Sequence, residues 1–155
     1  MKPYPYDKFK IRLPYDCKEA IRRILDNTEP TSFAQSQSKT KIFLGQVNAC
    51  SFKIQKSIRY QNSFLPIAQG KISNDGFYCV VTVTLRLSIS TIVFMLIWFG
   101  YFIKMIIEYY VVTSEIQLLP ASFLLFGYVL VMSGFWFDAP RTEQAIKDVF
   151  KLVPE

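Results

Sequence analysis

Histidine is absent from the 155 residues, and the three cysteines, Cys17, Cys50 and Cys79, are an odd number at wide spacing. Zinc sites need clustered Cys and His ligands, so the sequence predicts no metal site. Without His, acid–base catalysis falls to Asp, Glu, Lys, Tyr or Cys, and none of these forms a catalytic motif here. The cysteine spacing argues against a disulfide framework and is typical of a reducing compartment. We therefore expect no catalytic residues, no metal and no cofactor.

Charge is missing from two long stretches, residues 87–103 and 118–137. About 20 apolar residues are enough for a helix to cross a hydrocarbon layer of roughly 30 Å. In lipid every backbone group must be paired within its segment, which a helix achieves. The sequence therefore predicts a transmembrane hairpin over 87–137, with helices at about 87–110 and 118–137. The alternative, two core helices of a soluble protein, is disfavoured because so short a chain has little left to wrap them.

The side of the membrane follows from the charge distribution. A short connection makes the two helices antiparallel, so both ends of the chain lie on one side. Before Ser88 there are fourteen Lys or Arg against six Asp or Glu, a balance of +8. Residues 104–117 carry one Lys and two Glu, a balance of −1. Because Lys and Arg are retained in the cytoplasm, we expect a multi-pass membrane protein with both termini cytoplasmic.

Alternating apolar and polar residues predict strands at 6–13, 41–47, 51–60, 64–72 and 77–87, with a hairpin turn at 73–76. An apolar stripe over 17–25 predicts an amphipathic helix, preceded by the capping-box pair Asp16 and Glu19 and ended by residues 27–30. Asp138, Ala139 and Pro140 resemble a helix start, which predicts a C-terminal amphipathic helix over 138–155. The fold class is α+β, an antiparallel sheet covered by one or two helices, with a cytosolic head at 1–86.

A segment between two of these strands reads I-R-Y-Q-N-S-F-L-P, from Ile58 to Pro66, with Gly70 and Lys71 after it. This Y-x-N-S-F-x-P segment resembles one in a family of uncharacterised small bacterial membrane proteins. In that family a soluble α+β head precedes two membrane helices, and the resemblance spans most of the chain. It implies the architecture and no activity. Asn62 and Ser63 are good turn formers, so a structural role also explains the segment.

Basic residues give the predicted sheet a positive bias that suits anionic lipid headgroups, at about 1 kcal/mol per residue near the surface. The candidates are Lys53, Lys56, Arg59, Lys71 and Arg86. The alternative is an ordinary solvated face that serves as a topology signal. Nucleic-acid binding, with bases stacked on Phe52, Tyr60 and Phe64, is not expected because no nucleic-acid motif is present.

Lys104 and Glu108 are four residues apart and share a helix face. An interfacial pair with Lys104 extended toward the headgroups is favoured over an ion pair on a transport path, because two helices enclose no pore. Gly100, Gly127 and Gly134 allow close helix packing, either within the hairpin or in a homo-oligomer.

These observations favour a non-catalytic, membrane-anchored binding or scaffolding module, with membrane lipids, a second copy or a membrane complex as partners. One alternative is a lipid or small hydrophobic ligand held in a pocket lined by Phe52, Ile54, Val81 and Val83. Another is an accessory subunit of a larger membrane complex. An empty pocket would favour the ligand, and a filled core beside a bare apolar surface would favour the others.

Overall fold

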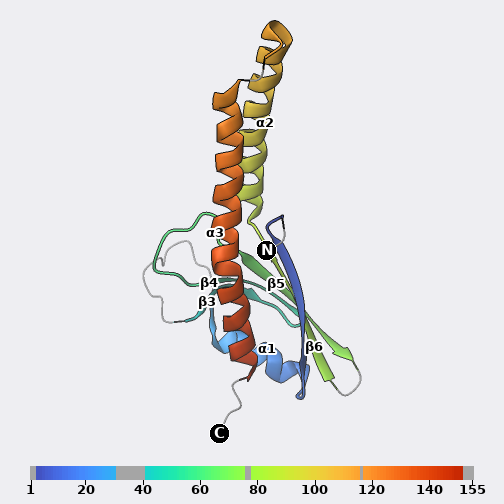
Figure 1. The fold of residues 1–155 in the computed structure, drawn as a ribbon. Coiled ribbons are helices and arrows are strands. Elements are labelled where there is room, and N and C mark those ends of the chain that lie inside the picture. The colour runs from blue at the N-terminus through green and yellow to red at the C-terminus, as the bar shows by residue number, and fades with distance from the viewer. Residues whose placement is uncertain (1–2, 31–40, 76–77, 116, 152–155) are drawn as a thin grey trace.

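The computed structural model describes residues 3–30, 41–75, 78–115 and 117–151, and it shows a sheet with three helices (Figure 1). Its elements are β1 (Tyr6–Leu13), α1 (Cys17–Asp26), β2 (Thr28–Pro30), β3 (Phe43–Val47), β4 (Ser51–Lys56), β5 (Ile67–Asp75), β6 (Tyr78–Arg86), α2 (Ile89–Thr113) and α3 (Leu118–Lys151). We call the sheet, α1 and residues 138–151 of α3 the head, and α2 with residues 118–137 the hairpin. This arrangement confirms the predicted fold class of an α+β head with two long apolar helices.

The sheet has six strands in the order β1-β6-β5-β4-β3-β2. All neighbours are antiparallel except β2 and β3, so the sheet is mixed where the sequence predicted an antiparallel one. β2 occupies the residues that were predicted only to end the preceding helix. Three residues are too few for alternation to identify a strand, and β2 depends on its pairing with β3. β4 ends at Lys56 instead of residue 60, and β5 begins at Ile67 instead of residue 64. Residues 57–66 therefore form a loop between the two strands.

One face of the sheet carries the core. Alternate residues of β4 and β6 point toward α1 and the C-terminal half of α3, where they pack with Ile24, Ile146 and Phe150. Phe52, Ile54, Val81 and Val83, the residues considered as a pocket lining, are at most 3% exposed and belong to this cluster. The core is therefore filled at the place where a ligand pocket was considered.

Phe52 shows how closely the inner face is packed. Its ring lies over Gly70, which is its cross-strand partner on β5. A Cβ at position 70 would overlap the ring, so a residue with any side chain would displace Phe52 from the core. This contact explains a glycine in the middle of a long strand, where glycine otherwise weakens pairing.

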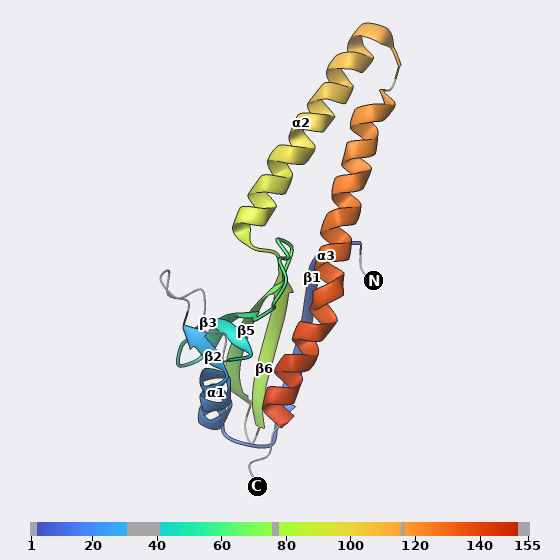
Figure 2. The same ribbon diagram turned by 90° about the vertical axis from the view of Figure 1, so that its left-hand side faces the viewer.

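α3 runs without interruption for 34 residues and passes through Pro140 (Figure 2). The predicted helix start at Asp138 is therefore wrong, and residues 152–155 of the predicted helix lie outside the described part of the chain. Buried positions at Phe135, Asp138, Thr142 and Ile146 continue one face across the proposed boundary. That continuous face stabilises the helix beyond the proline, although Pro140 cannot donate a hydrogen bond to the carbonyl of the preceding turn.

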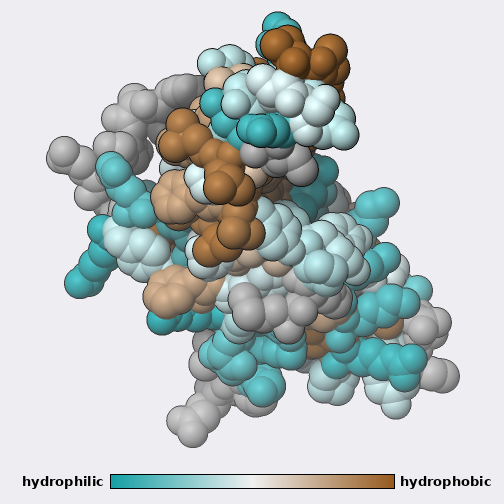
Figure 3. Space-filling model, turned by 45° about the horizontal axis from the view of Figure 1, so that its top comes forward, coloured by the Kyte–Doolittle hydropathy of each residue, from teal (hydrophilic) through white to brown (hydrophobic). Residues whose placement is uncertain are grey.

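The hairpin is apolar and bare. α2 and α3 are both long and apolar enough to cross a membrane, and only 6% and 22% of their most apolar 18-residue windows are buried. A core helix of a soluble protein would be mostly buried, as the inner-face residues of β6 are. Figure 3, with the hairpin end brought forward, shows brown hydrophobic side chains over much of the hairpin, some teal hydrophilic ones toward its tip, and mainly teal ones over the head.

α2 has ordinary caps at both ends. The Ser88 hydroxyl accepts a hydrogen bond from the Thr91 N–H at 3.1 Å, which satisfies one of the free donors at the helix start. Ser114 adopts φ 57° at the other end, and its N–H donates to the Tyr110 carbonyl at 2.8 Å. α3 then runs back along α2, as predicted for an antiparallel pair (Figure 2).

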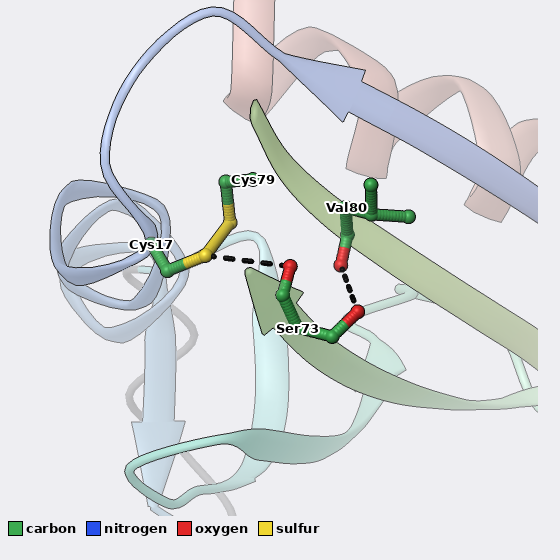
Figure 4. The surroundings of a disulfide bond; sticks show 4 residues. All are labelled: Cys17, Ser73, Cys79 and Val80. Atoms are coloured by element: carbon green, nitrogen blue, oxygen red, sulfur yellow. Dashed lines mark hydrogen bonds between the residues drawn. A yellow bond between two sulfur atoms is a disulfide. The ribbon is translucent and has the colours of Figure 1, made fainter. Parts of the chain in front are cut away.

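A disulfide joins Cys17 at the start of α1 to Cys79 on the inner face of β6, with the Cα atoms 5.1 Å apart (Figure 4). The prediction against a disulfide is therefore wrong, and its argument for a reducing compartment falls with it. The wide spacing of Cys17 and Cys79 in the sequence does not keep them apart in the fold. β1 pairs Leu13 with Cys79, which places the start of α1 beside β6. Cys50 is a free, exposed cysteine. The predicted capping box is also not formed, because Asp16 makes no side-chain cap and Glu19 pairs with Arg23 at 2.9 Å.

Candidate functional site

The loop between β4 and β5 fastens the head to α3 through a buried carboxylate. Asp138 is 0% exposed, and it accepts hydrogen bonds from the Tyr60 hydroxyl and from the Asn62 side-chain amide, the latter at 2.6 Å. The same amide donates to the Gly134 carbonyl at 2.9 Å, and the Asn62 Oδ1 accepts from the Phe64 N–H at 2.9 Å. Both ends of the Asn62 amide are thus occupied, which fixes its orientation.

The same loop reaches the start of α2. The Thr91 hydroxyl donates to the Ser63 carbonyl at 3.0 Å, and the Phe64 ring lies against Gly134 of α3. A Cβ at position 134 would come within 2.9 Å of Phe64. We call this set of contacts, made by Tyr60, Asn62, Ser63 and Phe64, the clasp. It joins β4, β5, α2 and α3 at the point where the head meets the hairpin.

The electrostatics of the clasp favour a structural role over a chemical one. Burial of its hydroxyl and then the hydrogen bond to Asp138 raise the pKa of Tyr60 above its ordinary value, so the phenol stays protonated and donates. Arg141 lies 3.8 Å from Asp138 and stacks over the Phe137 ring at 3.9 Å. A buried carboxylate needs such partners to offset its lost hydration. Both of its oxygens accept hydrogen bonds within the protein, and the side chain is 0% exposed, so a substrate has no access to it.

Sequence reasoning missed Asp138, which it treated as the start of a separate helix. A usable signal was present, because Asp138 follows directly on an uncharged run and Gly134 lies four residues earlier on the same helix face. Buried carboxylates are rare and nearly always paired, so an acid at this place suggests a specific partner. The Y-x-N-S-F-x-P segment supplies that partner.

The predicted basic residues do not form one cluster. Lys53, Lys71 and Arg86 lie on the outer face of the sheet, opposite the core. Lys56 lies on the inner side, where its ammonium group donates to the Arg141 carbonyl at 3.5 Å. Arg59 is exposed in the clasp loop.

β1 adds cations that sequence reasoning did not connect with these. The register places Lys10, Thr82 and Lys71 in one row across the outer face, and the next row holds Lys8 and Lys53. We call the six outer-face cations the basic face: Lys8, Lys10, Arg12, Lys53, Lys71 and Arg86. Among the described side chains, none of the six forms an ion pair, and the outer faces of β1, β4 and β6 carry no carboxylate.

The predicted glycine and ion-pair residues of the hairpin fall in three different surroundings. Gly127 faces the indole of Trp98 on α2, so it serves packing within the hairpin. Gly134 belongs to the clasp, and a Cβ at Gly100 would meet nothing within 4 Å. Lys104 and Glu108 form an ion pair at 3.5 Å on α2, with 70% and 65% of their side chains exposed.

Within the described ranges, no group of three or more His, Cys, Asp or Glu residues is placed to hold a metal ion. The chain matches no protein-family model, no curated protein and no solved structure. The function is therefore inferred from the clasp, the hairpin and the basic face.

Proposed function

We propose that this protein is a non-catalytic binding module anchored in a membrane, with the hairpin crossing the bilayer and the head presenting the basic face to an acidic protein surface. The observation that carries the proposal is the bare apolar hairpin on a well-packed head. At 1.5 Å per residue, α2 is about 37 Å long and residues 118–137 span about 30 Å, which matches the hydrocarbon thickness. Twelve large apolar side chains of α2 are more than a third exposed.

The position of Lys104 agrees with this placement. It lies about 22 Å along α2 from Ile89, and Glu108 lies about 28 Å along, near the far boundary of a 30 Å layer. Lys104 can extend toward the headgroups at that depth, with Glu108 beside it. These distances support the interfacial pair over a transport path.

The geometry of the head favours a protein partner over lipid headgroups. Counted along β6 at about 3.3 Å per residue, Lys8 and Lys53 lie about 7 Å below Arg86, Lys10 and Lys71 about 13 Å, and Arg12 about 20 Å. The Debye length is about 8 Å at physiological ionic strength, so half of the basic face is screened from the bilayer. The basic face therefore points sideways, along the membrane surface.

Nucleic acid is a poorer match for the basic face. Phe52 is 3% exposed in the core, and Phe64 packs on Gly134, so two of the three aromatic residues considered for base stacking are occupied. Single-stranded nucleic acids need exposed aromatic rings beside the charges. An acidic protein surface needs only the cations.

Two observations bear on the sidedness, and they point in opposite directions. The head carries the excess of Lys and Arg, which favours the cytoplasm, whereas stable disulfides are commonest in oxidising compartments. We propose that both termini are cytoplasmic, because the Lys and Arg distribution acts during insertion, before the head folds. The Cys17–Cys79 pair would then cycle with the redox state of the cell.

The test uses the full chain in lipid nanodiscs and a fluorescent poly-glutamate peptide as the acidic probe. We expect Lys53→Gln/Lys71→Gln to weaken binding about tenfold, and the charge-matched control Lys18→Gln/Arg22→Gln on α1 to leave it unchanged. Equal losses in both variants would reduce the effect to net charge and contradict the proposal. Release of the wild-type chain from membranes by alkaline carbonate would contradict the anchoring.

A further inference from the structure

A cavity of about 820 Å³ opens at the end of the head farthest from the hairpin. It lies between the free edge of β1, the connection to α1, and the last two turns of α3. Its apolar wall includes Ile11, Leu13, Pro14 and Phe150. Small-molecule sites commonly have volumes of about 300–1,000 Å³ and are mostly apolar with a few polar groups.

Five cations and no carboxylate line this cavity. Two of the five are already neutralised, because Arg23 pairs with Glu19 at 2.9 Å and Lys147 pairs with Glu143 at 2.6 Å. The other three are Lys10, Arg12 and Lys151. Within the described part of the chain, these three make no ion pair or hydrogen bond. Like charges around one opening repel one another, and a bound anion would relieve that repulsion.

The walls are held in place without a ligand. The Tyr15 hydroxyl donates to the Phe150 carbonyl at 2.8 Å, and the Arg23 guanidinium donates to the same oxygen at 3.4 Å. Arg23 also lies 4.6 Å from the centre of the Tyr15 ring. These contacts satisfy a carbonyl at the end of α3 that has no partner within the helix, and they fix α3 against α1. The cavity is therefore preformed, which lowers the entropic cost of binding.

We propose that this cavity binds a free amphiphile with an anionic head, a carboxylate or a phosphate, and an apolar body. The apolar wall takes the body, and Lys10, Arg12 and Lys151 hold the head through charge-assisted hydrogen bonds. Phe150 lies about 20 Å along α3 from Phe137, the end of the apolar run, so the headgroup of a lipid in a flat bilayer does not reach the cavity. This inference rests on the proposed membrane anchoring only for that distance. The cavity shares Lys10 and Arg12 with the basic face, whereas Lys151 belongs to the cavity alone.

The test is photo-crosslinking of the full chain in nanodiscs, because mapping the crosslink separates the cavity from the bilayer. The probe is dodecanoate with a diazirine at the end of its chain. We expect mass spectrometry to find crosslinks in the peptides that hold Ile11 to Tyr15 and Phe150. Unlabelled dodecanoate or dodecyl phosphate should compete, dodecanol should not, and the stronger of the two anions identifies the headgroup.

The variant Arg12→Gln/Lys151→Gln should reduce cavity crosslinking at least about tenfold, since two charge-assisted contacts are lost. The control is Lys53→Gln/Lys71→Gln, which removes equal charge from the basic face and should leave crosslinking unchanged. Crosslinks confined to the hairpin, competition by dodecanol equal to that by dodecanoate, or equal labelling of the two variants would overturn the inference. In the Lys53→Gln/Lys71→Gln control we expect crosslinking to be retained while poly-glutamate binding is weakened, because neither residue lines the cavity.

Discussion

At Gly134 the clasp contacts α3 so closely that the Phe64 ring occupies the space that a side chain would take. We expect Gly134→Ala to lower the free energy of unfolding by about 1–3 kcal/mol, as in other overpacked contacts. The measurement is thermal unfolding in detergent. Gly100→Ala is the matched control, since a Cβ there meets nothing within 4 Å and alanine favours a helix. If Gly134→Ala lowers the free energy of unfolding no more than Gly100→Ala does, Phe64 is not tightly packed against α3.

The disulfide closes a segment of 62 residues between α1 and β6. Chain-entropy arguments assign such a bond about 2–4 kcal/mol of stability, through restriction of the unfolded chain. We expect Cys17→Ser/Cys79→Ser to lose that amount, measured by denaturant unfolding. Cys50→Ser, which removes the exposed free cysteine, should change nothing. A reductant should destabilise the wild type and leave the double variant unaffected.

Tyr15 and Tyr60 report on the two ends of the head through their ionisation. Burial is the main cause that raises the pKa of each phenol above 10, with Arg23 opposing it at Tyr15 and Asp138 adding to it at Tyr60. A folded-state pKa above the unfolded value contributes stability that is complete below pH 10 and is lost as the pH rises through the folded pKa.

We therefore expect the absorbance titration of the folded protein to contain two late phenols, which Tyr15→Phe and Tyr60→Phe each remove singly. Each variant should also lose less stability than the wild type between pH 10 and 12. Titration of the unfolded chain supplies the baseline, and phenols that ionise alike in both states would refute the assigned burial.

At the scale of elements, α3 joins the hairpin to the head as one helix, and a substitution at Pro140 tests whether the helix is continuous. Pro140 is exposed and lies inside the helix, so Pro140→Ala creates no cavity and restores a missing hydrogen bond. We expect the free energy of unfolding to rise by about 1–3 kcal/mol. At the first turn of a separate helix, by contrast, proline is favourable, and its replacement would be neutral or destabilising. Thermal unfolding of the two proteins distinguishes these outcomes.

The elements that sequence predicted well are those whose pattern is local. β1 and β6 alternate over their whole lengths, α1 has a complete apolar face, and the uncharged runs gave both helices of the hairpin. β2 escaped because it depends on pairing with β3. The continuity of α3 was not predicted, because Pro140 indicated the start of a new helix. The buried face that continues past the proline is visible only in the folded protein.

The candidate sites were predicted less well, for a similar reason. The clasp segment was singled out, yet its partners Gly134 and Asp138 lie more than 70 residues away. The Cys17–Cys79 bond and the two rows of the basic face also join distant segments. Contacts of this kind follow from the register of the sheet, which the sequence does not display.

At the scale of the whole molecule, sidedness is open to a direct labelling test. Cys50 is exposed on the head, and Glu115→Cys in a Cys50→Ser background moves the exposed free thiol from the head to the turn. In intact cells we expect an impermeant maleimide to label position 115 and to label Cys50 only after permeabilisation. The reverse pattern would place the head outside and agree with a permanently oxidised Cys17–Cys79 pair. Labelling of both without permeabilisation would contradict the hairpin.

In the proposed membrane placement, the continuous helix α3 couples the orientation of the head to the tilt of the hairpin in the bilayer. Transmembrane helices tilt further in thinner membranes. Because the clasp joins the head to both helices, the head would tilt with them. A lean of about 10° carries the far end of α3 sideways by about 3.5 Å over its 20 Å reach. In that placement, the length of the surrounding lipid chains would set the direction in which the basic face points.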